Sequence, residues 1–397
     1  MSVIVIDQIM GSYKTTFAIE YMKSRPLENF MYITPYLEEI KRIKLATKDK
    51  KQFISPENKG SGKLESLKYL IRNEEDIAST HELFRHYDLE TREELQRTKY
   101  TLILDEVLDV LEPYPIKKDD LKILKDSKCI NIDEEGYVIW NNDYKDYDSE
   151  YNEIKNLSES HMLFFLKDTV LLWKYPPEIF DLFENVFILT YLFEGSIMKY
   201  YFDYHEIQYT KKCVSKQNNK YILCDFKRSN TSKYKELITI YDEPNKYKLF
   251  QKPSALSKNW FEQNKDKCNI FKNCCYNFFR HICKSSCNEV MWTTFKDFKY
   301  FTKPRSYTKG FVSFNCRSTN EYNNRKYLAY LVNIYPNPNI EVFFQSKNII
   351  FNKDLYALSI FLQWIWRSQI RENKEIIIYI PSERMKNLLI KWLDNCF

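Results

Sequence analysis

The chain begins with an apolar run, a polar loop and an amphipathic segment, and strands and helices then alternate along its first half. Residues 3–6 form an unbroken β-branched run, which predicts a strand buried on both faces. Residues 17–22 continue as a predicted helix. Further strands are expected at residues 29–33, 76–78, 100–104 and 186–189, with helices at residues 37–43 and 64–72. This alternation predicts a parallel α/β sheet, with its ligand site at the carboxyl ends of the strands.

The regular pattern is interrupted twice. Residues 113–175 are expected to be an insertion, in which residues 129–140 form a hairpin and residues 161–173 a helix. Residues 206–264 are strand-like, irregular and rich in lysine, so we expect a strand-rich region that joins two domains. These domains would span residues 1–205 and 265–397.

The second domain is expected to repeat the α/β pattern of the first. Helices are predicted at residues 271–282, 322–332, 354–370 and 382–393, and strands at residues 290–292, 311–313 and 375–380. The helix at 271–282 carries small thiols between apolar residues at helical spacing, so it is interpreted as buried. The fold class is therefore α/β, with two parallel-sheet domains in tandem and an insertion in or after the first.

Composition narrows the class of protein only moderately. A length of 397 residues favours two domains, and a net charge of +6 permits a polyanionic partner without demonstrating one. The chain begins with a core strand in place of a secretory signal, and no apolar run is long enough to span a bilayer. Ten cysteines without such a signal are typical of reduced thiols in a cytoplasm. We therefore expect a cytoplasmic protein without a membrane partner.

The loop between the first strand and the first helix has the arrangement of a phosphate-binding loop. Gly11, Ser12 and Tyr13 precede Lys14, Thr15 and Thr16, and the helix follows directly. In such loops backbone N–H groups and the helix N-terminus contact the anion, the lysine bridges the outer phosphates, and the next hydroxyl ligates magnesium. The sequence therefore predicts an ATP and Mg²⁺ site at Lys14 and Thr15.

Two positions depart from the usual pattern of this loop. Gln8 stands where the first glycine belongs, and Tyr13 replaces the glycine before the lysine. A side chain at position 13 would strain the loop if that residue needs a positive φ angle. The alternative interpretation is a strand, turn and helix with a lysine and threonine that occur by chance.

Two acids end the strand at residues 100–104. Asp105 and Glu106 follow four apolar or β-forming residues, which is the second signature of ATPases. The first acid holds magnesium and the second polarises the water that attacks the γ-phosphate. The alternative is a solvated acidic turn, and the phosphate loop upstream favours the ATPase interpretation.

A third stretch, near the C-terminus, resembles the sixth motif of superfamily 2 helicases, Gln-x-x-Gly-Arg-x-x-Arg. Gln363, Arg367 and Arg371 match its polar positions, although Trp366 replaces the glycine and Arg371 comes one residue late. On a helix that delay rotates the side chain by roughly 100°. The resemblance implies that Arg367 stabilises transition-state charge and that Gln363 and Arg371 also reach the ATP. The alternative is an amphipathic helix with exposed arginines.

Weaker matches extend the same resemblance along the chain. Residues that end predicted strands, or match later motifs, stand where that family contacts nucleic acid: Thr34, Pro35, Tyr36, Arg42, Thr80, His81, Thr190, Trp292, Thr293, Arg317 and Thr319. Hydroxyls at strand ends are suited to phosphates, and Tyr36, His81 and Trp292 to base stacking. For each aromatic residue the alternative is a role in the core. The set is similar to helicase-type replication proteins of tailed bacteriophages, which implies two RecA-like domains.

The function expected from these motifs is an ATP-dependent helicase or translocase that acts on DNA in phage replication. The implied partners are single-stranded or forked DNA and other replication proteins, and the protein is expected to be a monomer. One alternative is a DNA-packaging ATPase, although no cluster of nuclease acids follows Asp297. Another is a non-hydrolysing single-strand-binding protein with a degenerate ATP site, which Gln8 and Tyr13 would favour.

Overall fold

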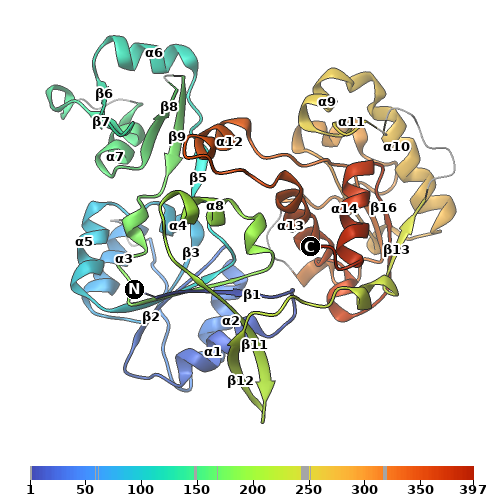
Figure 1. Cartoon of the computed structure of the whole chain (residues 1–397), viewed down its shortest axis with the longest axis horizontal. Coiled ribbons are helices and arrows are strands. Elements are labelled where there is room, and N and C mark those ends of the chain that lie inside the picture. The colour runs from blue at the N-terminus through green and yellow to red at the C-terminus, as the bar shows by residue number, and fades with distance from the viewer. Residues whose placement is uncertain are drawn as a thin grey trace. The chain divides into compact units, whose positions relative to one another are not determined.

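The computed structural model divides into two compact units and describes residues 2–58, 60, 62–146, 150–167, 169–242, 250, 252–315 and 320–397. One unit comprises Met1–Gln8, Ser12–Lys227 and Asn337–Phe351, and the other comprises Ile9–Gly11, Arg228–Pro336 and Asn352–Phe397. Figure 1 shows the elements of each unit along the chain. Within the described residues, no helix is both long enough and apolar enough to cross a membrane.

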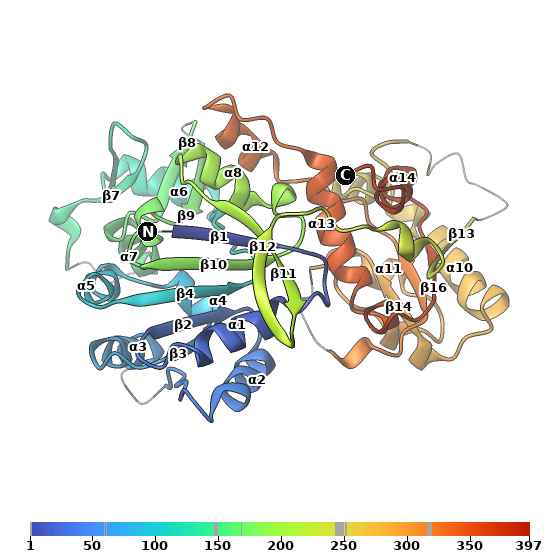
Figure 2. The same ribbon diagram turned by 60° about the horizontal axis from the view of Figure 1, so that its bottom comes forward.

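The first unit is built on a sheet of seven strands. Their order is β12-β11-β1-β10-β4-β2-β3, and every pair is parallel except β11 with β12. The strands are β1 (Ser2–Asp7), β2 (Asn29–Thr34), β3 (Ile77–Thr80), β4 (Tyr100–Asp105), β10 (Asn185–Thr190), β11 (Thr210–Gln217) and β12 (Lys220–Asp225). Figure 2 shows β1, β10, β4, β2 and β3 side by side. In β1, β2, β3, β4 and β10 most β-branched and aromatic residues are buried on both faces, as expected for a parallel sheet covered by helices, whereas Ile222 of β12 is exposed.

Helices pack against this sheet through their apolar stripes. They are α1 (Lys14–Lys23), α2 (Leu37–Thr47), α3 (Lys63–Arg72), α4 (His81–Arg85), α5 (Leu89–Arg97) and α8 (Ile197–Tyr204). Phe17 of α1 and Ile43 of α2 join one core cluster with Tyr32 of β2 and Phe187 of β10. Because strand side chains alternate between faces, Met31 next to Tyr32 lies on the other face, where it accepts a hydrogen bond from the hydroxyl of Tyr87.

The insertion forms two small antiparallel sheets, β5-β9-β8 and β6-β7. Its elements are β5 (Leu111–Pro113), α6 (Lys118–Asp126), β6 (Ile130–Ile132), β7 (Val138–Trp140), α7 (Asn152–Glu159), β8 (Leu163–Leu166) and β9 (Val170–Lys174). The predicted hairpin at residues 129–140 is confirmed by the pairing of β6 with β7. The predicted helix at residues 161–173 is wrong, because β8 and β9 pair there as a hairpin. Short apolar runs of this kind have no periodicity that separates strand from helix.

A segment from late in the sequence belongs to the first unit. Helix α12 (Pro338–Gln345) places Phe343 against Phe164 of the insertion and Tyr204 of α8, with ring centroids 5.3 Å and 4.4 Å away. The ammonium group of Lys347 donates to the carbonyl oxygen of Tyr204 at 2.9 Å. In Figure 1, α12 lies beside β5.

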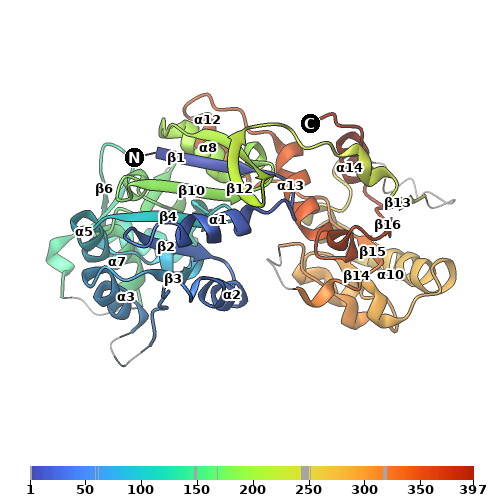
Figure 3. The same cartoon turned by 90° about the horizontal axis from the view of Figure 1, so that it is seen from below.

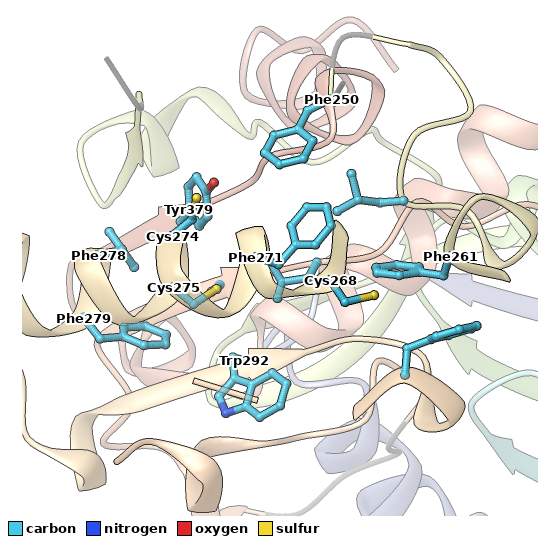
Figure 4. Packing of buried hydrophobic residues seen from close by; sticks show 14 of the residues in the cluster. Phe250, Phe261, Cys268, Phe271, Cys274, Cys275, Phe278, Phe279, Trp292 and Tyr379 are labelled. Carbon is cyan, nitrogen blue, oxygen red and sulfur yellow. The ribbon is translucent and has the colours of Figure 1, made fainter. Parts of the chain in front are cut away.

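The second unit has a parallel four-stranded sheet in the order β13-β16-β15-β14. Its elements are β13 (Ile238–Tyr241), α9 (Lys258–Gln263), α10 (Cys268–Asn277), β14 (Val290–Thr293), α11 (Lys299–Thr302), β15 (Tyr327–Tyr330), α13 (Lys353–Ile365), β16 (Ile376–Tyr379) and α14 (Glu383–Leu393). The buried helix predicted around residues 271–282 is α10, extended by a turn of π-helix at Phe278–Ile282. Figure 4 shows Cys268, Phe271, Cys274 and Cys275 of this helix in the core of the unit.

Two predictions in the second unit need correction. Residues 322–332 were expected to be a helix, but Tyr327–Tyr330 form strand β15, which is central in the sheet and buried on both faces. Residues 311–313 form no strand, and Phe311 makes only an isolated bridge with Trp292. Gly310, just before it, is packed so closely that a Cβ atom there would lie 2.7 Å from a methyl carbon of Val290.

The strand-rich region expected at residues 206–264 contains strands that belong to the sheets of the two units. Within residues 206–264, strands β11 and β12 extend the first sheet next to β1, which Figure 3 shows from below. Strand β13, in contrast, belongs to the sheet of the second unit. The stretch therefore contributes regular structure to both units.

Candidate nucleotide site

The predicted phosphate loop has the expected elements at its two ends. Strand β1 ends at Asp7, and α1 begins at Lys14 with Tyr13 as its N-cap residue. The first N–H groups of a helix have no partner within the helix, which makes this end suitable for an anion. The ammonium group of Lys14 donates a hydrogen bond to the carbonyl oxygen of Gln8, so the lysine folds back over the loop.

Tyr13 adopts the left-handed backbone conformation that would strain a residue with a side chain. Its φ is +66° and its ψ 12°, and Gly11 two residues earlier has a φ of +82°. The left-handed region costs an L-residue such as tyrosine roughly 1–2 kcal/mol relative to glycine. Strained backbone of this kind gathers at functional sites, where the surrounding structure holds it in place.

Gln8, the other departure from the pattern, is held by the neighbouring strand. The backbone N–H of Val214 donates to its side-chain oxygen at 2.9 Å, and its side-chain nitrogen donates to the carbonyl oxygen of Val214 at 3.1 Å. Strand β11 pairs with β1 as far as Ile6 and Lys212. The amide of Gln8 thus continues the ladder past the end of β1.

Asp105 ends β4 beside the loop in an environment that disfavours its negative charge. Burial raises the pKa of this carboxyl to about 7, and the negative charges of Glu39 and Glu106 act in the same direction. The positive charge of Lys14 acts in the opposite direction and lowers the pKa of Asp105. The hydroxyl of Thr34 donates to Asp105 at 3.3 Å.

Glu106 also has a left-handed backbone, with a φ of +75°. Its N–H donates to the carbonyl oxygen of Leu189 in β10 at 3.0 Å, which fixes the turn after β4 against the next strand. Leu192, after β10, has a φ of +56°. Three residues with a strained backbone therefore lie at the carboxyl edge of the sheet: Tyr13, Glu106 and Leu192. Ligands of α/β folds bind at this edge.

Asp7 is a residue of this edge that the sequence did not reveal. Its carboxylate accepts hydrogen bonds from the N–H groups of Leu192 at 2.8 Å and Phe193 at 3.1 Å. Burial raises the pKa of Asp7, while those two N–H groups and the charges of Lys211 and Lys14 act against the shift. An acid directly after a buried β-branched run was the available signal.

The donor set fits a magnesium nucleotide. Mg²⁺ is usually bound by one or two carboxylates together with phosphate oxygens and water, and dedicated cages of protein ligands are rare. No group of three metal-ligating side chains occurs in the described part of the chain. Asp105 and Thr15 would hold the ion, and a divalent cation would compensate the charge of Asp105, Glu106 and Glu39.

The residues predicted to contact nucleic acid have several different environments. Thr34 and Thr190 are fully buried, and Thr34 serves Asp105, as described above. Thr80 caps α4 by accepting a hydrogen bond from the N–H of Leu83 at 3.2 Å. Among the others of the first unit, Pro35, Tyr36 and His81 are half-buried, while Arg42 is exposed and pairs with Glu39 at 2.8 Å. These contacts argue against Thr34, Thr80 and Thr190 as phosphate ligands in this conformation.

Trp292 and Thr293, from strand β14, lie in the core of the second unit. Both side chains are fully buried, and the indole N–H of Trp292 donates to the carbonyl oxygen of Tyr307 at 2.8 Å. Trp292 is therefore a core residue, and its predicted role in base stacking does not fit this position. Arg317 and Thr319 lie outside the described residues.

The helix predicted to carry Gln363, Arg367 and Arg371 is shorter than expected. The predicted rotation of Arg371 around a continuous helix therefore does not apply. Helix α13 ends at Ile365, so Gln363 is in its last turn and Arg367 and Arg371 follow it. Ser368 caps a 3₁₀ turn at Gln369–Glu372, which sets the direction of Arg371 in place of a continuous helix. Trp366, where the motif has glycine, packs between Tyr234 and Trp392 in the core.

Comparison with solved structures supports the assignment of the fold. The chain is similar over its whole length to a structure titled XPD_APO, with 12% identity, a TM-score of 0.51 and coverage of 100% of this chain and 96% of the other. A second similar structure is Xpd4 of S. tokodaii, with 12% identity, a TM-score of 0.52 and coverage of 98% and 94%. The fold is thus an α/β architecture of tandem RecA-like domains with small inserted sheets, which confirms the predicted fold class.

Comparison of sequences gives the family. Residues 232–393 match the model of the YonV C-terminal Rossmann-like domain, and residues 111–173 match that of the YonV middle domain. The chain is also 40% identical over 405 residues to the SPbeta prophage-derived uncharacterized protein YonV of Bacillus subtilis (strain 168), with coverage of 98% of each. The chain therefore belongs to the YonV family of prophage proteins.

Proposed function

We propose that this protein is an ATP-dependent nucleic-acid helicase or translocase that acts on DNA in phage replication. The observation that carries the proposal is the position of Lys14. Lys14 begins α1 and its ammonium group donates to the carbonyl oxygen of Gln8, at the edge of the sheet where β1 ends at Asp7 and β4 ends at Asp105. A lysine next to a magnesium-binding acid at this edge is the arrangement of phosphoryl-transfer sites.

Each residue of the site has a proposed role in ATP hydrolysis. Lys14 contacts the outer phosphates, the backbone of Gly11, Ser12 and Tyr13 lines the loop, and Thr15 and Thr16 begin the helix that faces the anion. Asp105 and Thr15 hold Mg²⁺, which neutralises phosphate charge when bound. Glu106 polarises the attacking water. Gln363, Arg367 and Arg371 keep the roles that the helicase resemblance implies.

DNA is the proposed substrate because of the fold and the family. The tandem RecA-like architecture is shared with XPD structures, and the relative is named as prophage-derived. Single-stranded or forked DNA, held by surface residues such as Tyr36 and Arg42, would be the track of a monomeric motor. Other replication proteins are further proposed partners.

The degenerate, non-hydrolysing alternative loses part of its support. Gln8 was evidence for decay, yet its amide makes two hydrogen bonds with β11, which gives the substitution a structural reason. A DNA-packaging ATPase would need a nuclease site. No group of three metal-ligating acids occurs among the described residues, which favours the helicase over that alternative.

Phosphate release with and without single-stranded DNA tests the proposal. Wild-type protein should hydrolyse ATP faster with DNA, whereas Lys14→Ala and Glu106→Gln should reduce turnover by at least about a hundredfold. Glu106→Gln should still bind ATP. Lys122→Ala, on an exposed face of α6, is the matched control and should behave like wild type. Near wild-type turnover in both site variants would contradict an ATPase, and ATP binding without any hydrolysis would favour the non-hydrolysing alternative.

A further inference from the structure

Both positions that depart from the phosphate-loop pattern contact the same hairpin. Gln8 bonds to Val214 of β11, and the ring of Tyr13 lies against the ring of Tyr221 in β12, with centroids 5.2 Å apart and planes at 37°. The hairpin formed by β11 and β12 is therefore joined to the loop at two points.

The hairpin is firmly held where it approaches the loop. The N–H of Tyr221 donates to the carboxylate of Glu20 in α1 at 3.3 Å. Tyr221 and Leu223 pack against the core cluster beneath α1, and Val214 of β11 is part of that cluster. Tyr221 is thus fixed beside α1, with its backbone bonded to Glu20 and its ring against Tyr13.

Tyr13 is unusual because a strained backbone presents an exposed aromatic ring. Its φ is +66°, and 54% of the residue is accessible to solvent although it touches Tyr221. Contact with Tyr221 alone does not require a strained backbone at position 13. A glycine there would adopt the same conformation without strain. An exposed ring beside the phosphate-binding lysine indicates contact with a ligand.

The position of Tyr13 in the chain places its ring within reach of a nucleotide bound at Lys14. Tyr13 precedes Lys14 directly, so their Cα atoms are about 3.8 Å apart. A nucleotide whose phosphates contact Lys14 has its base within one nucleotide length of the ring. Aromatic side chains bind bases through their π-faces with little dependence on sequence.

We propose that Tyr13 and Tyr221 form a stacking platform for the base of the bound nucleoside triphosphate. This inference rests on the proposed nucleotide site and adds its base subsite. The hairpin of β11 and β12 is then a part of the nucleotide site that the phosphate-loop motif does not include. It also explains why tyrosine stands at a position that favours glycine, since the ring compensates for the strain when the base is bound.

Comparison of ATP with inorganic tripolyphosphate separates the base subsite from the phosphate site. We would measure the affinity of each by calorimetry for the full-length protein, wild type and variants, with Mg²⁺. Tyr221→Ala should weaken ATP binding about five- to thirtyfold and leave tripolyphosphate binding within about twofold. Tyr221→Phe keeps the ring and should bind both like wild type.

Two further variants make the outcomes distinguishable. Tyr69→Ala removes another tyrosine of the first unit, 64% exposed on α3, and should change neither affinity. Lys14→Ala should weaken ATP and tripolyphosphate alike, and unchanged binding of both would contradict the phosphate site itself. With that site intact, the platform is overturned if Tyr221→Ala weakens both ligands equally or neither. Thermal unfolding of each variant shows whether a loss of affinity reflects loss of the fold.

Discussion

The side chain of Gln8 pairs with the backbone of Val214 as a peptide group would. Its oxygen accepts from the N–H of Val214 at 2.9 Å, and its nitrogen donates to the carbonyl oxygen at 3.1 Å. A glycine at position 8 would leave both backbone groups of Val214 without these partners. Because Val214 is buried, the amide stabilises the junction between the loop and β11.

Gln8→Leu should destabilise the first unit. The variant keeps much of the side-chain volume but removes two hydrogen bonds, so we expect the free energy of unfolding to fall by about 1–3 kcal/mol. Urea unfolding of the variant and wild type measures this difference. Gln217→Leu is the matched control, because Gln217 is exposed at the tip of β11. Equal stability of the Gln8 variant would show that water replaces the amide without cost.

Tyr13→Gly exchanges backbone strain for the loss of a ring contact. Glycine adopts a φ of +66° without the cost that tyrosine pays, roughly 1–2 kcal/mol, but it cannot contact Tyr221. We expect unchanged or slightly higher thermal stability together with weaker ATP affinity, because the ring is part of the proposed stacking platform. Tyr13→Asn tests the backbone separately, since asparagine tolerates the left-handed region better than tyrosine. A sharp rise in ATP affinity for Tyr13→Gly would identify the tyrosine as a brake or a relic of decay.

The alternation of strands and helices was visible in the sequence wherever a strand was a long apolar run. Strands β1, β4 and β10 belong to this class, since a parallel sheet buries them on both faces. The prediction of one helix over β8 and β9 is wrong because two four- or five-residue apolar runs have the same hydrophobic pattern as a buried helix. Strand β15 was mistaken for the same reason.

The site was partly predictable because its motif residues either lie close together in the sequence or stand at the ends of strands. Lys14 and Asp105 were found in this way, and their electrostatic interaction depends on the parallel order of β1 and β4. Tyr221 and Val214 were missed because they reach the loop from more than 200 positions away in the sequence, through a hairpin assigned to a linker. A truncation near residue 205 would therefore remove two strands of the first sheet, and the helix α12 would also be lost.

The shifted pKa of Asp105 predicts a pH dependence with a definite sign. Its carboxyl has an ordinary pKa of 3.8 and a pKa of about 7 in the folded protein. Between these values the native state binds more protons than the unfolded chain, so the contribution of Asp105 to stability falls as the pH rises from about 4 to about 7. Asp105→Asn should therefore be more stable than wild type above pH 7, on the order of 2 kcal/mol after solvent screening.

Urea unfolding at several pH values tests this prediction. The difference between Asp105→Asn and wild type should disappear near pH 4, where the wild-type carboxyl is protonated in both states. Asp225→Asn is the control, since this exposed acid pairs with Lys212 and its pKa is lowered by that contact. Magnesium should reverse the order in the presence of ATP, because it binds the ionised carboxylate. A constant difference at every pH would contradict the assigned pKa.

Arg367 carries the prediction that depends most on the helicase resemblance. It follows the end of α13, is only 8% exposed, and its Nε has no hydrogen-bond partner among the described residues. A buried guanidinium that is not fully paired is costly for a fold, which favours a role in stabilising the negative charge that develops in the transition state. Arg367→Ala should therefore spare ATP binding and suppress DNA-stimulated hydrolysis by about a thousandfold or more.

Two comparisons separate that role from a structural one. Arg367→Lys keeps the charge but loses the planar fork of donors. It should therefore fold like wild type and retain only a small part of the hydrolysis. Arg371→Ala removes an exposed arginine of the 3₁₀ turn and should cost much less activity. Steady-state hydrolysis with saturating single-stranded DNA, alongside the unfolding temperature of each variant, measures both effects. Full activity of Arg367→Ala in a stably folded protein would make residues 363–371 an ordinary part of the core, in which Trp366 already lies against Tyr234 and Trp392.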